Sequence, residues 1–221
     1  MNKAAFFDID GTLFRNSLLV EHFLKLVDAG ILDRKIWTEE IGPLYSKYEN
    51  RFGAYEDYLE KSASAYQKAM VGLDKEVVDK YAQIVLVENK DKVYNVTRNA
   101  VKKHIDEGFL IFFISGSPDF LVDDFSKLYK ATDSISTSYI FDENNKFTGK
   151  VLPMWDGENK LAAVGKLKEK YDLDLSESYA YGDTNGDITM FQLVGHPHAI
   201  NPSFELIDNL YKDEELRKKA V

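Results

Sequence analysis

Apolar residues follow two alternating patterns along this chain. Short apolar runs, which are typical of buried parallel strands, occupy residues 4–9, 109–114, 178–181 and 199–200. Between these runs, apolar residues recur at helical spacing over residues 94–107, 118–130, 159–171 and 203–219. Pro118 suits the first turn of its helix, because its missing N–H would lack a partner there. Strands that alternate with helices predict an α/β fold, a doubly wound parallel sheet.

Two features interrupt the alternation in the second half of the chain. Apolar residues at 135–141 and 146–151 flank the polar stretch 142–145, which predicts a β-hairpin inserted into the α/β pattern. The tripeptide His196-Pro197-His198 precedes the last apolar run. No third nitrogen ligand for a metal ion is evident, so we interpret the tripeptide as a loop before the last strand.

Residues 18–92 have a different pattern, with no convincing strand and apolar spacing that predicts about four helices. Leu19, Phe23, Leu26 and Val27 share one helical face, and Gly30 is suited to ending that helix. This insertion breaks the α/β alternation straight after the first strand. Two arrangements remain open from the pattern: extra helices packed on the sheet, or a separate helical cap over a site.

Composition narrows the functional classes. The chain has 221 residues and a net charge of −9, which argues against a nucleic-acid partner because such proteins usually carry a basic face. The absence of cysteine excludes disulfides, thiolate zinc sites and a cysteine nucleophile. No apolar run approaches the ~18 residues that span a membrane, so we expect no membrane partner. Met1 leads into a strand without room for a signal peptide, so we expect a cytoplasmic protein.

Acidic and small polar residues follow three of the predicted strands. Asp8 and Asp10 follow the first strand, Ser115 the second and Asp183 the third. Ligands bind at the carboxyl ends of the strands in an open parallel sheet, so these residues are expected at one edge. Asp187 lies four residues after Asp183, and one helical turn could place both carboxylates on the same side.

This constellation suits phosphoryl transfer assisted by a metal ion. The carboxylates of Asp8, Asp10, Asp183 and Asp187 would repel one another unless a divalent cation lay between them. Ligands that are all oxygen favour Mg²⁺ over Zn²⁺. Asp8 could then attack phosphorus as a nucleophile, once the metal and a lysine such as Lys160 screen the phosphate charge.

Other residues have supporting roles in this interpretation. Asp10 could protonate the leaving alkoxide and later deprotonate a water molecule. Ser115 could donate a hydrogen bond to a phosphoryl oxygen. Gly11 and Gly116 would allow backbone N–H groups to approach the phosphate closely.

Four motifs in this order resemble the haloacid dehalogenase superfamily, and within it subfamily IB, the phosphoserine-phosphatase-like branch. They are Asp8-Ile9-Asp10-Gly11-Thr12, Ser115-Gly116-Ser117, Gly157-Glu158-Asn159-Lys160 and Gly182-Asp183-Thr184-Asn185-Gly186-Asp187. The resemblance covers nearly the whole chain. It implies a haloacid-dehalogenase-like Rossmannoid core of residues 1–17 and 93–221, with a helical cap domain of residues 18–92.

The resemblance also implies roles for the matching residues. The catalytic residues would be Asp8, Asp10, Ser115 and Lys160, and the phosphate-binding residues Gly11, Ser115, Gly116 and Lys160. Mg²⁺ would be held by Asp8, Asp183, the backbone carbonyl of Asp10 and, directly or through water, Asp187. The substrate would be a small phosphorylated metabolite.

Three positions depart from the pattern of phosphoserine phosphatases. The chain has Gly11 where they usually have serine, Ser117 where they usually have glycine, and Ser17 where they carry a glutamate that helps to hold the substrate amine. Glu21 lies one helical turn beyond Ser17. The resemblance therefore carries over the chemistry and not the substrate.

Three functions fit these residues. The first is a Mg²⁺-dependent phosphatase that hydrolyses a small phosphomonoester through an aspartyl-phosphate. The second is a phosphotransferase or mutase that uses the same intermediate. The third is a non-catalytic protein that binds a phosphorylated metabolite, which predicts the loss of the nucleophile, the acid or the lysine, and none of these is missing.

Overall fold

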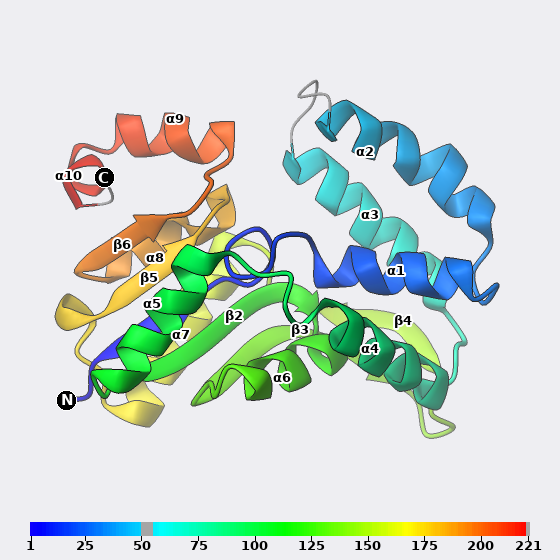
Figure 1. The fold of residues 1–221 in the computed structure, drawn as a ribbon, viewed down its shortest axis with the longest axis horizontal. Coiled ribbons are helices and arrows are strands. Elements are labelled where there is room, and N and C mark those ends of the chain that lie inside the picture. The colour runs from blue at the N-terminus through cyan, green and yellow to red at the C-terminus, as the bar shows by residue number, and fades with distance from the viewer. Residues whose placement is uncertain (50–54, 220–221) are drawn as a thin grey trace.

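A six-stranded sheet forms the centre of the molecule (Figure 1). The computed structural model describes residues 1–49 and 55–219, and the side chains of residues 1–47 and 58–219. The strands have the order β4-β3-β2-β1-β5-β6, and only β4 is antiparallel to its neighbour. They are β1 (Ala4–Phe7), β2 (Leu110–Pro118), β3 (Asp133–Phe141), β4 (Phe147–Leu152), β5 (Tyr179–Gly182) and β6 (His196–Ala199).

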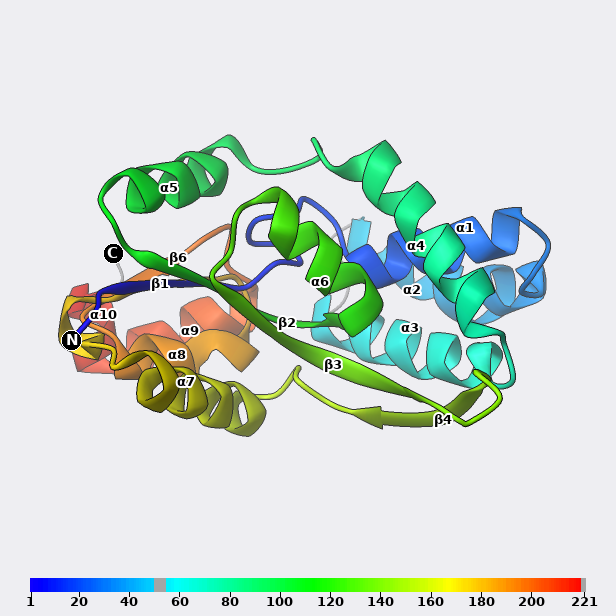
Figure 2. The same ribbon diagram turned by 90° about the horizontal axis from the view of Figure 1, so that it is seen from below.

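Helices cover both faces of this sheet, so the predicted doubly wound α/β fold is confirmed. Figure 2 shows α5 (Asn95–Asp106) and α6 (Asp119–Leu128) on one side of the strands and α7 (Gly157–Tyr171) on the other. The face with α7 also carries α8 (Ile188–Leu193), α9 (Phe204–Lys212) and α10 (Glu214–Lys219). Short 3₁₀ helices occupy Leu175–Glu177 and Asn185–Asp187. No helix in the described part of the chain has the length and apolar character needed to cross a bilayer.

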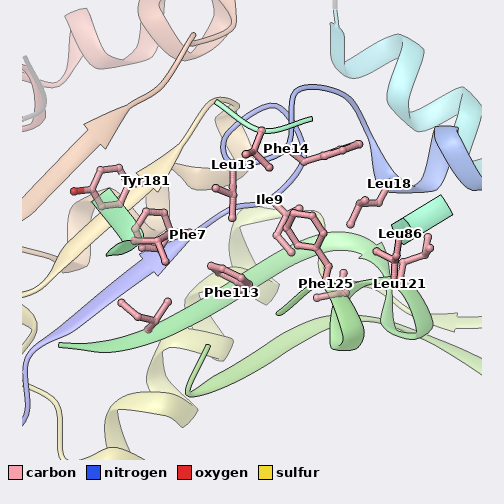
Figure 3. Packing of buried hydrophobic residues seen from close by; sticks show 14 of the residues in the cluster. Phe7, Ile9, Leu13, Phe14, Leu18, Leu86, Phe113, Leu121, Phe125 and Tyr181 are labelled. Carbon is pink, nitrogen blue, oxygen red and sulfur yellow. The ribbon is translucent and has the colours of Figure 1, made fainter. Parts of the chain in front are cut away.

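The alternation of side chains along β1 divides the core into two layers. Ala5 and Phe7 pack on the α5 and α6 side, where they join the apolar cluster shown in Figure 3. Ala4 and Phe6 pack on the other side, against α7 and α8. All four are fully buried, as expected for a central parallel strand covered by helices on both faces.

The elements of regular secondary structure described between β1 and α5 are helices joined by loops. Its helices are α1 (Leu18–Asp28), a π-helix (Ile36–Ile41), α2 (Gly42–Glu49), α3 (Tyr55–Met70) and α4 (Lys75–Asn89). The face of α1 predicted from Leu19, Phe23, Leu26 and Val27 is buried in a cluster with α3 and the β3–β4 hairpin. By contrast, α4 places Ala82, Val85 and Leu86 in the apolar cluster that also contains residues of β1, β2 and α6. The domain boundaries at residues 17/18 and 92/93 stay a prediction.

The predicted hairpin exists, but β3 has a second role that the pattern did not indicate. Its first half pairs with β2 in parallel, from Phe112 opposite Asp133 to Pro118 opposite Thr137. Its second half pairs with β4 in the antiparallel hairpin. The hairpin is therefore a continuation of the main sheet and not an insertion beside it.

The interpretation of His196-Pro197-His198 as a loop is wrong, because these residues form β6. Proline is tolerated because β6 is an edge strand. The backbone N–H groups of His196 and Ile200 donate to the carbonyls of Ser178, just before β5, and Gly182, the last residue of β5, so the nitrogen of Pro197 faces the free edge. The imidazole of His198 stacks on Tyr181, with ring centroids 4.9 Å apart, which adds an aromatic contact to the strand pairing.

Two helix boundaries also differ from the prediction. Pro118 is the N-cap of α6 and the last residue of β2, so it precedes the first turn. The segment 203–219 contains two helices, because Asp213 leaves the helical conformation. Its carboxylate then accepts hydrogen bonds from the N–H groups of Glu215 and Leu216, which caps α10.

Candidate active site

The carboxyl ends of three neighbouring strands bring the predicted motifs together. Strand β1 lies between β2 and β5, so the loop after it lies between the loops that follow the other two. The N–H of Asp8 donates to the carbonyl of Tyr181 at 2.9 Å, which continues the pairing into the loop. A cleft of about 480 Å³ opens there, lined by Asp8, Asp10 and Lys160 among others.

Lys160 joins two of the predicted acidic residues. Its Nζ donates to Oδ1 of Asp8 at 2.8 Å and to Oδ1 of Asp187 at 2.6 Å. The lysine comes from the first turn of α7, whose N-cap Asp156 accepts a hydrogen bond from the N–H of Asn159 at 2.8 Å. All three members of this ion-paired group are buried, so the site holds its lysine in one place.

Asp183 is held by the loop that follows β1. Its Oδ1 accepts a hydrogen bond from Oγ1 of Thr12 at 2.9 Å. Gly11 lies beside it with a φ of +83°, and a Cβ atom at Gly11 would be 2.1 Å from Oδ2 of Asp183. The N–H of Gly11 donates to the carbonyl of Phe14 at 2.9 Å. Gly11 therefore makes room for Asp183, and its own N–H is not directed at the cleft.

Asp187 organises the loop that carries Asp183. Its Oδ2 accepts hydrogen bonds from the N–H groups of Asp183 and Thr184, both at 3.0 Å. The turn between them is a 3₁₀ helix with a capping box formed by Thr184 and Asp187. The two carboxylates are brought together as predicted, by a tighter turn than an α-helical one.

Asp10 faces a different set of partners. Its Oδ1 accepts a hydrogen bond from the N–H of Leu18 at 2.7 Å, and its Oδ2 accepts one from Oγ of Ser117 at 2.5 Å. Oγ of Ser117 also accepts a hydrogen bond from the N–H of Leu19 at 3.2 Å. Asp10 and Ser117 together thus cap the start of α1, where Ser17 makes no side-chain cap.

Ser115 and Gly116 lie at the end of β2, where the strand bends away from its regular register. Ser115 is fully buried, and its Oγ accepts a hydrogen bond from the N–H of Ser117 at 3.1 Å. The carbonyl of Gly116 accepts a hydrogen bond from Oγ1 of Thr137 at 2.8 Å. Trp155 packs against Gly116, and a Cβ atom there would be 3.1 Å from the Cβ of Trp155.

Sequence reasoning did not assign Thr12 or Ser117 to the site. Both hydroxyls hold a carboxylate that it did assign, Asp183 and Asp10 respectively. The signal for Ser117 was available, since serine stands there in place of the glycine usual in phosphoserine phosphatases. Thr12 carried no separate signal, because a threonine in that motif could as well have been part of an ordinary turn.

Burial raises the pKa values of three carboxyl groups of the site, those of Asp8, Asp10 and Asp183. Burial raises the pKa of Asp8 to about 7, with Lys160 opposing and Asp187 and Asp10 adding to the shift. Burial likewise raises the pKa of Asp10 to about 6, and the hydrogen bond from Ser117 opposes it. The pKa of Asp183 is raised well above its ordinary value by burial and by Asp8 and Asp187.

The site therefore carries more buried negative charge than its lysine neutralises. Burial disfavours the charged form of Lys160, but Asp187 and Asp8 outweigh it and raise the pKa of the lysine above its usual range. Carboxylate oxygens from Asp8, Asp183 and Asp187 lie within 4.8 Å of one another. Buried oxygen ligands at this spacing fit a hard divalent cation. The carboxylate of Asp10 is not in that group, and the predicted role of its backbone carbonyl stays a prediction.

Comparison with known proteins identifies the family. The profile of the haloacid dehalogenase-like hydrolase family matches residues 5–192. The inhibition of morphological differentiation protein of Streptomyces azureus is 26% identical over 220 residues, 99% of this chain and 75% of that protein. Phosphoserine phosphatase SerB1 of Mycobacterium tuberculosis is 28% identical over 216 residues, 93% of this chain and 67% of that protein.

The fold agrees with this match. A substrate-bound phosphoserine phosphatase superposes with a TM-score of 0.65 at 20% identity, over 100% of this chain and 91% of the other. The family profile spans β1 through α8, which includes every motif described above. The chain belongs to the haloacid dehalogenase-like hydrolase family.

Proposed function

We propose that this hydrolase is a Mg²⁺-dependent phosphatase that cleaves a small phosphomonoester through an aspartyl-phosphate. One observation carries the proposal: Asp8 lies in the cleft with Lys160 on one oxygen and with Asp10 two residues away on the same loop. A nucleophile, a cation and a second carboxyl group are thus available at one point. The relatives named above include a phosphoserine phosphatase, which supports the same reaction class.

In the first step, Oδ of Asp8 attacks phosphorus and the bond from phosphorus to the ester oxygen breaks. Asp10 gives its proton to the leaving oxygen, which departs as an alcohol. A pKa raised to about 6 keeps part of the Asp10 population protonated near neutral pH. Lys160 and the hydroxyl of Ser115 would bind phosphoryl oxygens and hold the phosphate in line.

In the second step, water attacks phosphorus and releases phosphate and the carboxylate of Asp8. Asp10, now ionised, takes the proton from that water. Asp8, Asp183 and Asp187 would hold Mg²⁺, with the backbone carbonyl of Asp10, and the bound ion supplies positive charge against the phosphate dianion. Ser117 keeps the carboxyl group of Asp10 directed at the cleft throughout.

The helical segment of residues 18–92 limits the size of the substrate in this proposal. We propose that residues 18–92 act as the cap of this enzyme, because Leu19 of α1 and Leu59 of α3 line the same cleft as Asp8. Such a cover excludes water while the aspartyl-phosphate forms. It also leaves room for a small leaving group and not for a protein chain or a nucleic acid.

A phosphate-release screen with Mg²⁺ tests the proposal. The panel contains amino-acid, sugar, polyol and lipid-headgroup phosphates and an aryl phosphate, with water as the sole acceptor. We expect release of inorganic phosphate from at least one small ester and from the aryl phosphate. Formation of a new phosphoester from an added alcohol, without release of inorganic phosphate when water is the sole acceptor, would indicate a phosphotransferase instead.

The matched variant is Asp8→Asn, which keeps the shape of the side chain and removes its attacking charge. We expect turnover to fall by at least about a thousandfold, with an unchanged far-ultraviolet circular dichroism spectrum. Asp28→Asn is the control, since Asp28 lies at the exposed end of α1 and pairs with Arg34. Substantial turnover by Asp8→Asn would refute the assignment of the nucleophile.

A further inference from the structure

Helix α3 has two faces with different roles. Tyr58, Ser62, Ala65, Tyr66 and Met70 are buried, and the apolar members pack against α1 and the β3–β4 hairpin. The residues on the other face line the catalytic cleft; they are Leu59, Glu60, Ala63, Ser64 and Gln67. Their spacing is that of one helical face, so they form a continuous strip of α3 along the cleft. Helix α3 itself lies beside α1 (Figure 1).

The other residues that line the cleft include a group at its phosphate-binding end and a group that provides apolar surface. Asp8, Asp10 and Lys160 belong to the phosphate end, together with Gly116 and Ser117. Leu19 of α1 and the half-exposed Trp155 contribute apolar surface. Ser17 and Thr184 also line the cleft, and neither carries a charge. When phosphorus lies in line with Asp8, the strip on α3 therefore provides a polar surface that includes a charged group for the leaving group.

This strip offers hydrogen-bond acceptors. Glu60 is exposed in the cleft and contributes a carboxylate, and the hydroxyl of Ser64 lies one turn further along. Nε2 of Gln67 donates to the carbonyl of Gly149 at 2.7 Å, which holds the amide and leaves its carbonyl oxygen as an acceptor. An ammonium group has three donors and no acceptor, so its chemistry is complementary to this strip.

The charges along the described lining also favour a cation over an anion. Lys160 is the basic residue among the lining residues that the structure describes, and its Nζ is taken by Asp8 and Asp187. A carboxylate on the leaving group would meet Glu60, which has the same charge. An amine at that position would meet an opposite charge.

We propose that this face of α3 is the leaving-group subsite of the enzyme and that Glu60 makes it prefer an amine-bearing leaving group over a carboxylate-bearing one. This inference rests on the proposed phosphatase function. It differs from the arrangement in phosphoserine phosphatases, because Ser17 stands where they carry the glutamate that helps to hold the amine. In this chain, the carboxylate comes instead from α3.

Three esters of similar size test the preference. Phosphoethanolamine carries a terminal amine, propyl phosphate an uncharged methyl group and phosphoglycolate a carboxylate. We expect kcat/KM to fall in that order for the unsubstituted protein. Glu60→Gln should reduce the ratio between phosphoethanolamine and phosphoglycolate by roughly three- to tenfold, as expected for a partly exposed charge pair. Glu60→Lys should reverse the order of these two esters.

The control is Glu76→Gln, which removes the same charge from α4. Glu76 is exposed in a different surface depression, beside Lys75 and Asp79, so its substitution should leave the ratio unchanged. An unchanged ratio in Glu60→Gln, or a ratio that Glu76→Gln alters equally, would overturn the subsite. The aryl phosphate separates the two proposals: no turnover of it by the unsubstituted protein would refute the phosphatase function itself.

Discussion

Gly11 shows how a single residue determines the geometry of the acidic cluster, which consists of Asp8, Asp183 and Asp187. Its φ of +83° is costly for any other residue, and a Cβ atom there would overlap Asp183. Gly72 has the same φ of +83° but has no neighbouring atom within 4 Å of an added Cβ. The two glycines therefore differ in surroundings and share their backbone conformation.

We expect Gly11→Ala and Gly72→Ala to behave differently. Both should lose about 1–2 kcal/mol of unfolding free energy from backbone strain. Gly11→Ala should in addition displace Asp183 and reduce phosphatase activity by at least tenfold, whereas Gly72→Ala should keep full activity. Urea denaturation and steady-state kinetics on both variants measure this contrast, and equal activities would show that the space beside Asp183 is unimportant.

The loss of rate on substitution of Asp10 should depend on the leaving group of the substrate. Asp10→Asn cannot donate a proton to the departing oxygen, so esters of poor leaving groups should lose about 10²–10⁴-fold in rate. An aryl phosphate with a good leaving group needs that proton less and should lose less rate in the first step. Single-turnover rates of an alkyl and an aryl ester compare the two directly; equal losses would exclude Asp10 as the acid.

The charged residues of the site could be predicted from sequence because each follows a strand or begins a helix. Asp8 and Asp183 lie directly after β1 and β5, and Ser115 lies near the carboxyl end of β2, and a parallel sheet places such positions at one edge. The hydrogen bonds of Thr12 and Ser117 depend on which loops face each other. That information is not contained in the local pattern around either residue.

At the scale of elements, His22 connects three helices of the inserted segment. Its Nδ1 lies 2.6 Å from Oη of Tyr66 on α3, and its Nε2 lies 3.1 Å from the carbonyl of Val78 on α4. A neutral imidazole satisfies both, since Nε2–H can donate to Val78 while Nδ1 accepts from Tyr66. Burial lowers the pKa of His22 to about 4, so the ring is neutral at physiological pH.

The burial of His22 predicts that the free energy of unfolding depends on pH. Below a pH of about 6.5 the unfolded chain protonates this histidine, whereas the folded protein does so only near pH 4. Folding is therefore favoured fully above pH 6.5 and progressively less as the pH falls toward 4. Between pH 7 and pH 5 the wild type should lose about 2 kcal/mol more unfolding free energy than His22→Gln.

Urea denaturation of both proteins at the two pH values gives this difference. Comparing the two proteins cancels the contributions of the active-site carboxylates, which are common to both. Parallel loss of stability in wild type and variant would show that His22 is protonated in the folded state.

The elements that were predicted incorrectly are those defined by distant partners. Strand β3 was recognised as half of a hairpin, because its pairing with β4 is local, while its pairing with β2 is not. The tripeptide in β6 contains a proline, which lowers the strand propensity of any isolated segment. Its position at the edge, beside Tyr181, overrides that propensity.

For the whole molecule, the acidic cluster links metal binding to stability. Carboxylates from two distant segments, Asp8 on one and Asp183 and Asp187 on the other, meet beside Lys160, so a divalent cation bound among them would stabilise the folded state over the unfolded one. Chelation should abolish phosphatase activity, and Mg²⁺ should restore it. A saturating Mg²⁺ concentration of about one hundred times Kd should add about 2.7 kcal/mol to the unfolding free energy.

Asp183→Asn should remove this stabilisation, and Asp208→Asn should keep it, because Asp208 is an exposed partner of Lys212 on α9. Thermal denaturation with Mg²⁺ and with chelator measures the effect without reference to catalysis. Full activity in excess chelator, or an equal response to Mg²⁺ in Asp183→Asn, would contradict the metal assignment.

The central position of β1 has a consequence for the order in which the protein can be assembled. This strand is synthesised before both of its partners, because it pairs with Leu110 to Phe113 on one side and with Tyr179 to Tyr181 on the other. Until both partners are synthesised, β1 has at least one edge of unpaired backbone N–H and C=O groups. Such an edge on an apolar strand favours pairing with other chains. A nascent chain that ends before β5 holds Asp8 but not Asp183 or Asp187. The acidic cluster is therefore completed only late in synthesis, and long-range pairing of this kind slows folding.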